Sequence, residues 1–212
     1  MTKPNAKRLQ RSEALYSHDC AWDAFGVSLA GMDEAGRGPL LGPVVAACVI
    51  MPKTPVLPWV DDSKKLSPKR RDEVFDEILK HALYIGVGEA SAEEIDEINI
   101  LNATKLAMQR AAAEAPATLC LVDAVRGLDV PFSIKPIIHG DAVSYSIAAA
   151  SIIAKVTRDR QLYSLAEMYP QYGLMQNKGY GTSDHIEALR LYGPCCEHRR
   201  SFIRNFTGEN DG

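Results

Sequence analysis

The sequence predicts an α/β fold in which a mixed sheet is flanked by helices. Strand-like apolar runs come early in the chain and strand and helix patterns then alternate. The 212 residues are 46% hydrophobic and 24% charged, as in ordinary globular proteins. A chain of this length can bury one sizeable core. We expect a helical N-terminal arm over residues 1–26, an α/β core over 27–168, and a C-terminal helical lobe with a tail over 169–212.

The first two strands are expected directly after the arm. Polar sequence with scattered apolar positions favours a helix before residue 27. Apolar runs predict strands over 27–32 and 44–51, and the short gap between them favours an antiparallel pair. The first of these strands ends at Asp33.

Helix-capping signals place the next elements. A Ser-Pro pair opens 67–81, where serine is a typical N-cap and proline a typical first helical residue. A third strand is expected over 83–90. The Ser-Ala-Glu-Glu sequence that opens 91–115 is a capping box, and Pro116 ends that helix.

Two more strands and a long helix are expected to complete the core. Residues 118–123 form a short apolar run that is typical of a buried strand, and 133–138 have a strand pattern as well. A helix rich in Ala, Ser and Ile is expected from Asp141 to Met168. In the lobe that follows, we expect a helix over 182–191.

The segment 31–43 carries the strongest chemical signal. Asp33 and Glu34 are adjacent acids, and Gly36-Arg37-Gly38 follows them at once. Adjacent carboxylates repel each other unless a cation lies nearby, and glycines allow the backbone to approach a phosphate. The segment therefore predicts a cation site beside a phosphate-binding loop.

Further acids occupy comparable places in the predicted fold. Asp123 ends a strand, as Asp33 does, and Asp141 opens the long helix. Sites form at strand carboxyl ends in open α/β sheets, so Asp33 and Asp123 are expected to lie close together. Glu34 can join them only if the chain turns, which Gly36 permits. Two plainer interpretations stay open, since Asp141 could serve only as an N-cap and Asp123 could merely begin a turn.

The clustered acids predict a two-metal centre. Magnesium and manganese take oxygen ligands and need no histidine or cysteine. Two such ions can stabilise the attacking and leaving oxygens of a phosphoryl displacement without a protein nucleophile. With two Mn²⁺ or Mg²⁺ ions as cofactors, the expected catalytic and metal-binding residues are Asp33, Glu34, Asp123 and Asp141.

Basic residues gather in three groups along the chain, although the formal net charge is −3. A single group is typical of a solvated face, but three groups around an acidic motif favour a nucleic-acid partner. Tyr180 lies between two glycines and would suit stacking on a ribose or base. The groups are Lys64, Lys65, Lys69, Arg70 and Arg71; Lys155, Arg158 and Arg160; and His198, Arg199, Arg200 and Arg204.

Cysteine content and hydropathy indicate a cytoplasmic protein. The five cysteines are an odd number without the spacing of a disulfide framework, which favours a reducing compartment. The sequence shows neither a secretory signal nor an apolar run long enough for a membrane span. We expect no membrane partner.

Six motifs in order resemble those of ribonuclease HII, the bacterial type 2 ribonuclease H. The resemblance extends from about residue 27 to 202. The related ribonuclease HIII carries an extra N-terminal substrate-binding domain, for which the arm is too short. The motifs are MDEAGRGPL at 32–40, DSKKLS at 62–67, INIL at 98–101, SIAAASIIAKVTRD at 146–159, NKGYGT at 177–182 and HRRSF at 198–202.

The resemblance implies a ribonuclease H-like catalytic core with a C-terminal helical subdomain. It implies endonucleolytic cleavage of RNA in RNA–DNA hybrids, and cuts on the 5′ side of ribonucleotides embedded in duplex DNA that leave a 3′-hydroxyl and a 5′-phosphate. The partners are then such hybrids and duplexes, and we expect the protein to act as a monomer. The family's four metal-binding acids coincide with the four acids named above.

The resemblance also assigns substrate contacts. The Gly-Arg-Gly motif matches the backbone that contacts the 2′-hydroxyl, Tyr180 matches a tyrosine that stacks at the RNA-to-DNA junction, and one of two lysines matches a phosphate contact. Asp159 matches a candidate supporting acid. The implied substrate-binding residues are Gly36, Arg37, Gly38, Lys64, Lys65 and Tyr180.

Departures from the family pattern and two other functions complete the expectations. Ala124 replaces a usual glycine, His139 replaces a common lysine, and Cys195-Cys196 is an unusual pair. A ribonuclease H-like nuclease of DNA structures would share the acids but ignore the 2′-hydroxyl. A non-catalytic nucleic-acid-binding module would keep the basic groups without needing four acids at strand ends.

Overall fold

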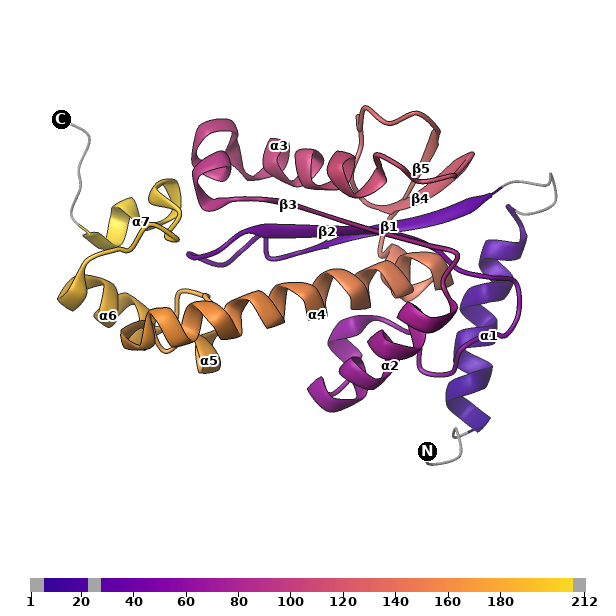
Figure 1. Ribbon diagram of the computed structural model, residues 1–212, viewed down its shortest axis with the longest axis horizontal. Coiled ribbons are helices and arrows are strands. Elements are labelled where there is room, and N and C mark those ends of the chain that lie inside the picture. The colour runs from indigo at the N-terminus through magenta and orange to yellow at the C-terminus, as the bar shows by residue number, and fades with distance from the viewer. Residues whose placement is uncertain (1–5, 23–27, 208–212) are drawn as a thin grey trace.

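The computed structural model describes residues 6–22 and 28–207 and confirms the predicted mixed α/β fold. A five-stranded sheet lies between two layers of helices, and a helical lobe extends from one end (Figure 1). The strands are β1 (Leu29–Ala35), β2 (Val44–Ile50), β3 (Tyr84–Ala90), β4 (Leu119–Asp123) and β5 (Ser133–Ile137). Residues 23–27, where the first strand was expected to begin, lie outside the described residues.

The sheet has the order β3-β2-β1-β4-β5. The pairs β1–β2 and β2–β3 are antiparallel, as the short gap after the first strand predicted. The pairs β1–β4 and β4–β5 are parallel. The carboxyl ends of β1 and β4 are therefore neighbours at one edge of the sheet, which is where sites form in such folds.

Helix α3 (Ala92–Ala112) covers one face of the sheet (Figure 1). Its capping box is present, because the Ser91 side chain accepts from Glu94 N and the Glu94 side chain accepts from Ser91 N. The helix ends three residues before the predicted position. It is also interrupted at Asn99, which has φ 64° and ψ 163° and whose Oδ1 accepts hydrogen bonds that restart the helix.

Helices α4 (Tyr145–Met168) and α2 (Pro68–His81) cover the other face. Ser67 caps α2 as predicted. Helix α4 approaches β1 so closely that a Cβ on Gly31 would lie 2.0 Å from the carbonyl carbon of Ser146. The long helix begins at Tyr145 and not at Asp141, because Ser144 is its N-cap. Asp141 lies instead in the separate 3₁₀ turn η3 (Gly140–Ala142), so the N-cap interpretation of this acid is wrong.

Helix α1 (Ala6–Cys20) packs beside the N-terminal end of α4 (Figure 1). The lobe contains η4 (Pro170–Tyr172), α5 (Leu174–Asn177), α6 (Ser183–Tyr192) and α7 (Arg200–Thr207), and η2 (Ser63–Lys65) precedes α2. A separate apolar cluster joins the lobe to α4 and to Leu40 and Leu41. Within residues 6–22 and 28–207, every helix is too short or too polar to cross a bilayer.

Candidate metal centre and nucleic-acid interface

Three carboxylates converge at the carboxyl ends of the central strands. Asp33 comes from β1, Asp123 from the end of β4, and Asp141 from η3. One oxygen of each lies within 4.8 Å of the other two. Parallel pairing of β1 with β4 brings the first two together, as strand-end reasoning predicted.

Backbone amides orient these carboxylates. Asp33 Oδ1 accepts from Glu34 N at 2.7 Å, and Asp123 Oδ1 accepts from Gly140 N at 2.8 Å. The second bond ties the end of β4 to the turn that carries Asp141. Asp123 therefore does more than begin a turn, since its side chain joins two parts of the acid cluster.

Glu34 lies near enough for its charge to raise the pKa of Asp33, but it is not among the three acids whose oxygens converge. β1 continues through Ala35 instead of turning, so Glu34 faces the opposite side of the sheet from Asp33. Its Oε1 accepts from Arg37 Nη1 at 3.3 Å. Its Oε2 is buried and has no hydrogen-bond partner among the described residues. A buried carboxylate oxygen without a partner is unfavourable, and a cation would satisfy it.

Electrostatics also favour a positive charge beside these acids. Burial raises the pKa of Asp33 well above its usual range, and the charges of Glu34, Asp123 and Asp141 raise it further. Burial likewise raises the pKa of Glu34 and of Asp141. The donors are carboxylate oxygens without histidine or cysteine. The set therefore fits a hard divalent cation.

The structure distinguishes the two candidate lysines. Lys64 Nζ lies 3.4 Å from Asp141 Oδ2, and its side chain is 80% exposed. Lys65 lies instead 3.9 Å from Asp61 and 3.7 Å from Asp62. Lys64 is thus the lysine that borders the acid cluster while staying open to solvent.

A fully buried arginine, Arg199, binds the backbone of the Gly-Arg-Gly loop. Arg199 donates to the carbonyl oxygens of Gly36 at 2.6 Å, Arg37 at 2.9 Å and Pro39 at 2.8 Å. Arg158 is buried against the same loop and donates to Leu41 O at 3.3 Å. Gly36 has φ +95°, and a Cβ there would lie 2.0 Å from Arg158 Nε, so the position requires glycine.

These contacts correct the interpretation of two basic groups. Arg158, His198 and Arg199 were expected to add to a nucleic-acid surface, but each is at most 1% exposed. Burial, with repulsion from Arg158, lowers the pKa of Arg199 to about 9. They shape the loop from inside the protein. Asp159 likewise contacts Lys155 at 2.6 Å and Arg71 at 3.3 Å, and the structure records no contact between it and the four acids.

Tyr180 lies beside the same loop and is 48% exposed. A Cβ on Gly38 would be 3.4 Å from its ring. Leu40 N donates to Gly179 O at 2.7 Å, and Asn177 Oδ1 accepts from Gly179 N at 2.8 Å. The structure therefore brings the tyrosine and the glycine loop together on one surface.

A buried histidine pair supports the Tyr180 segment, and sequence reasoning missed it. His198 Nδ1 accepts from Cys195 N at 3.0 Å, so its Nε2 carries the proton and donates to His185 Nε2 at 3.1 Å. His185 Nδ1 then donates to Tyr180 O at 3.0 Å. Burial, followed by repulsion from His185, lowers the pKa of His198 to about 4. Both rings are neutral in this chain of hydrogen bonds.

The other departures from the family pattern lie in the turns that carry the acids. Ala124 and His139 both have left-handed backbones, with φ 51° and 54°. Ala124 follows Asp123 directly, and His139 enters the turn of Asp141. A glycine would adopt either conformation more readily.

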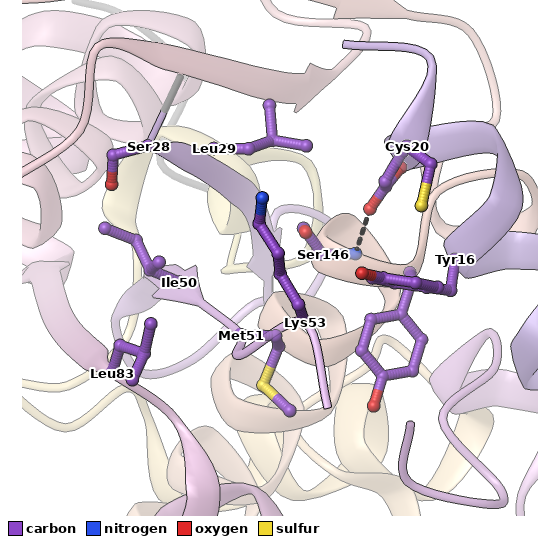
Figure 2. A pocket seen from close by; sticks show the side chains of 11 residues that line it. Tyr16, Cys20, Ser28, Leu29, Ile50, Met51, Lys53, Leu83 and Ser146 are labelled. Atoms are coloured by element: carbon purple, nitrogen blue, oxygen red, sulfur yellow. Dashed lines mark hydrogen bonds between the residues drawn. The ribbon is translucent and has the colours of Figure 1, made fainter. Parts of the chain in front are cut away.

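A cavity of about 160 Å³ lies apart from the acids, near the start of β1 (Figure 2). Tyr16, Lys53 and Ser146 are among its lining residues, and no member of the acid cluster is. The hydrogen bond drawn at Ser146 in Figure 2 runs from its backbone N to Asp19 Oδ2, at 2.8 Å.

Comparisons with known proteins agree with this geometry. A family model described as ribonuclease HII matches residues 30–205. The ribonuclease HII of Caldanaerobacter subterraneus subsp. tengcongensis is 53% identical over 177 residues, which cover 82% of this chain and 73% of the relative. The crystal structure of ribonuclease H2 from Pyrococcus horikoshii OT3 has a TM-score of 0.72 at 26% identity and covers 86% of this chain and 99% of its own. The structure of Bst-RNase HIII in complex with Mn²⁺ has a TM-score of 0.61 at 17% identity and covers 82% of this chain and 65% of its own. At that identity it supports the fold alone.

Proposed function

The chain belongs to the ribonuclease HII family, and from this premise we propose that it cuts duplex DNA on the 5′ side of an embedded ribonucleotide. Membership makes it a metal-dependent ribonuclease H, an endonuclease that acts on RNA–DNA hybrids. The proposal adds the position of the cut and its products, a 3′-hydroxyl and a 5′-phosphate.

The convergence of Asp33, Asp123 and Asp141 is the observation that carries the proposal. These three acids and Glu34 are the residues that would hold two Mg²⁺ or Mn²⁺ ions, and the unpartnered Glu34 Oε2 supports the inclusion of the fourth. When bound, the ions would supply charge stabilisation and an activated water for in-line displacement at phosphorus.

The Gly-Arg-Gly loop is proposed to bind the 2′-hydroxyl of the ribose. Arg199 donates hydrogen bonds to the carbonyl oxygens of Gly36 and Arg37. These bonds fix the loop and point the two carbonyl groups toward the protein interior. The backbone of this segment would then contact the 2′-hydroxyl, a group that DNA lacks. Discrimination between RNA and DNA thus comes from a loop adjoining the acids.

Two exposed side chains complete the proposed interface. Tyr180 lies against Gly38 and would stack on the sugar that follows the cleavage point. Lys64 borders Asp141 and would contact the phosphate, whereas Lys65 is directed to Asp61 and Asp62. The lysine role is therefore assigned to Lys64.

The experiment uses labelled duplex DNA that contains one ribonucleotide, with an all-DNA duplex as the control. We expect a metal-dependent nick on the 5′ side of the ribonucleotide, and a 3′ end that a DNA polymerase extends. Asp33→Ala should not cut. Equal cleavage of the all-DNA duplex would favour a nuclease of DNA structures, and binding without metal-dependent turnover would favour a non-catalytic module.

The domain division at residues 27 and 169 and the monomeric state stay predictions. Light scattering on the eluting protein tests the second of them, with an expected mass of 23.2 kDa. A mass of twice that value would contradict it.

A further inference from the structure

Helix α1 has no role in the function described so far, and the matched family region begins only at residue 30. The helix is nevertheless firmly packed at the N-terminal end of α4 (Figure 1). Leu15 is 1% exposed, and the ring of Tyr16 lies edge-on to that of Tyr145 with centroids 5.9 Å apart. Position and packing place α1 next to the turn that carries Asp141.

Arg11 of α1 contacts this turn directly. Its Nη2 donates to the carbonyl oxygen of Ala142, the residue after Asp141, at 2.6 Å. The same nitrogen lies 3.4 Å from Oδ1 of the buried Asp61. Ser12, the next residue of α1, donates to Val60 O at 3.1 Å. One guanidinium therefore joins the Asp141 turn to the segment that contains Asp61.

The turn is short, with backbone hydrogen bonds from Ala142 N to His139 O at 3.0 Å and from Val143 N to Gly140 O at 3.1 Å. It is a three-residue 3₁₀ element, entered through the left-handed His139. Hydrogen-bond geometry in short 3₁₀ turns is poorer than in α-helices, so contacts from outside help to position their side chains. Gly140 N already binds Asp123 Oδ1, which fixes the start of the turn. Arg11 fixes its end at Ala142 O.

Helix α1 also holds the chain just beyond the turn. Asp19 Oδ2 accepts from Ser146 N at 2.8 Å, in the first turn of α4 (Figure 2). The N-terminal helix thus contacts the chain on both sides of 143–145, through Arg11 and through Asp19.

We propose that Arg11 is a positioning residue that holds Asp141 within reach of Asp33 and Asp123 and so raises the metal affinity of the site. The inference rests on the proposed function, because it takes Asp141 to be a metal ligand. Arg11 acts through the Ala142 carbonyl and does not touch the metal. Groups that orient metal ligands in this way typically contribute about 10-fold to 100-fold in affinity.

The test compares Arg11→Met with Arg8→Met in the full chain. Arg8 lies on the same helix, its side chain is 39% exposed against 38% for Arg11, and it pairs with the same Asp61 at 3.9 Å. No contact between Arg8 and the Asp141 turn is recorded, so it is a matched control. Mn²⁺ affinity is measured from the electron spin resonance signal of free Mn²⁺ in the absence of substrate. Cleavage kinetics are measured at several Mn²⁺ concentrations.

We expect Arg11→Met to weaken Mn²⁺ binding about 10-fold, while kcat and the KM for the nucleic acid return to wild-type values at saturating Mn²⁺. Arg8→Met should bind Mn²⁺ like the wild type. Arg11→Lys, which keeps a donor and the charge, should recover part of the affinity, and it serves as the second variant if the methionine protein does not fold.

Two results would overturn the inference. Mn²⁺ affinity within twofold of wild type in Arg11→Met would show that the turn does not need the arginine. A raised KM at saturating Mn²⁺ with unchanged metal affinity would make Arg11 a nucleic-acid contact instead. Asp141→Asn separates this failure from failure of the proposed function. Wild-type Mn²⁺ affinity in that variant would show that Asp141 is not a metal ligand, and would contradict the proposed metal site.

Discussion

Replacing Asp33 by asparagine is expected to stabilise the metal-free protein while abolishing its activity. Asparagine keeps the size of the side chain and an oxygen for Glu34 N, but it removes a charge. At an effective dielectric constant of about 20, two unit charges 4.8 Å apart repel by about 3.5 kcal/mol. Asp33 has two such neighbours. Solvent and nearby Lys64 screen part of this repulsion, so we expect a gain of about 2 kcal/mol, below the repulsion from one neighbour.

The sign of the pH dependence follows from the raised pKa. Protonated Asp33 favours the folded state, so its stabilising contribution is complete below the unfolded value of 3.8 and is lost as pH rises through the folded value. The advantage of Asp33→Asn should therefore be absent at low pH and present at pH 8. A gain of about 2 kcal/mol raises the Tm of a chain of this size by about 4–8 °C.

The assay is thermal unfolding at pH 8 in EDTA and again with Mn²⁺, combined with the nicking assay. Wild type should gain stability with Mn²⁺, whereas Asp33→Asn should start higher, gain little and cut nothing. Asp129→Asn makes the same chemical change on an exposed loop residue and should behave like the wild type. A lower Tm than wild type in EDTA, or a full Mn²⁺-induced increase in Asp33→Asn, would refute the reasoning.

Three other outcomes are expected. Tyr180→Ala should lose at least 10-fold more cleavage of a single embedded ribonucleotide than Asp72→Ala, a change on an exposed face of α2, and equal losses would contradict the stacking role. Ala124→Gly should stabilise the protein by about 1 kcal/mol in urea unfolding, because alanine at φ 51° is strained; an unchanged midpoint would contradict this. The pKa of His198 is about 4 in the folded protein and 6.5 unfolded, so the folded state favours the neutral ring. The stability that this neutral ring contributes is complete above pH 6.5 and falls by about 3 kcal/mol toward pH 4. His198→Asn should flatten that decline in metal-free unfolding curves, and parallel curves for the two proteins would contradict the assignment.

Local signals explain what the sequence could predict. The helix caps form through hydrogen bonds between residues three positions apart, at Ser67, Ser91 and Glu94. A short stretch of sequence is therefore enough to predict them. Asp33 and Asp123 were placed together because each ends an apolar strand, and parallel neighbours align such ends. Fold class and the candidate acids follow from features of this kind.

The rest depends on contacts between distant residues. Arg199 binds Gly36 O across 163 positions, and nothing near either residue distinguishes a buried arginine from a surface one. The break at Asn99 arises because its own side chain satisfies the amides of Leu101 and Asn102, an alternative that helical periodicity does not reveal. The contact of Arg11 with Ala142 is equally distant in sequence, at 131 positions.

The long span between Arg199 and its loop has a consequence for the order of events during synthesis. The chain is made from its N-terminus, so β1 and the Gly-Arg-Gly loop leave the ribosome long before the arginine that holds them is translated. Domains fold as they emerge, but this loop reaches its final conformation only after Arg199 has been translated. A nascent chain can therefore form its sheet, and bring Asp33 beside Asp123, before the Gly-Arg-Gly loop has its final shape. The final shape of the loop therefore depends on a residue that is translated 163 positions after Gly36.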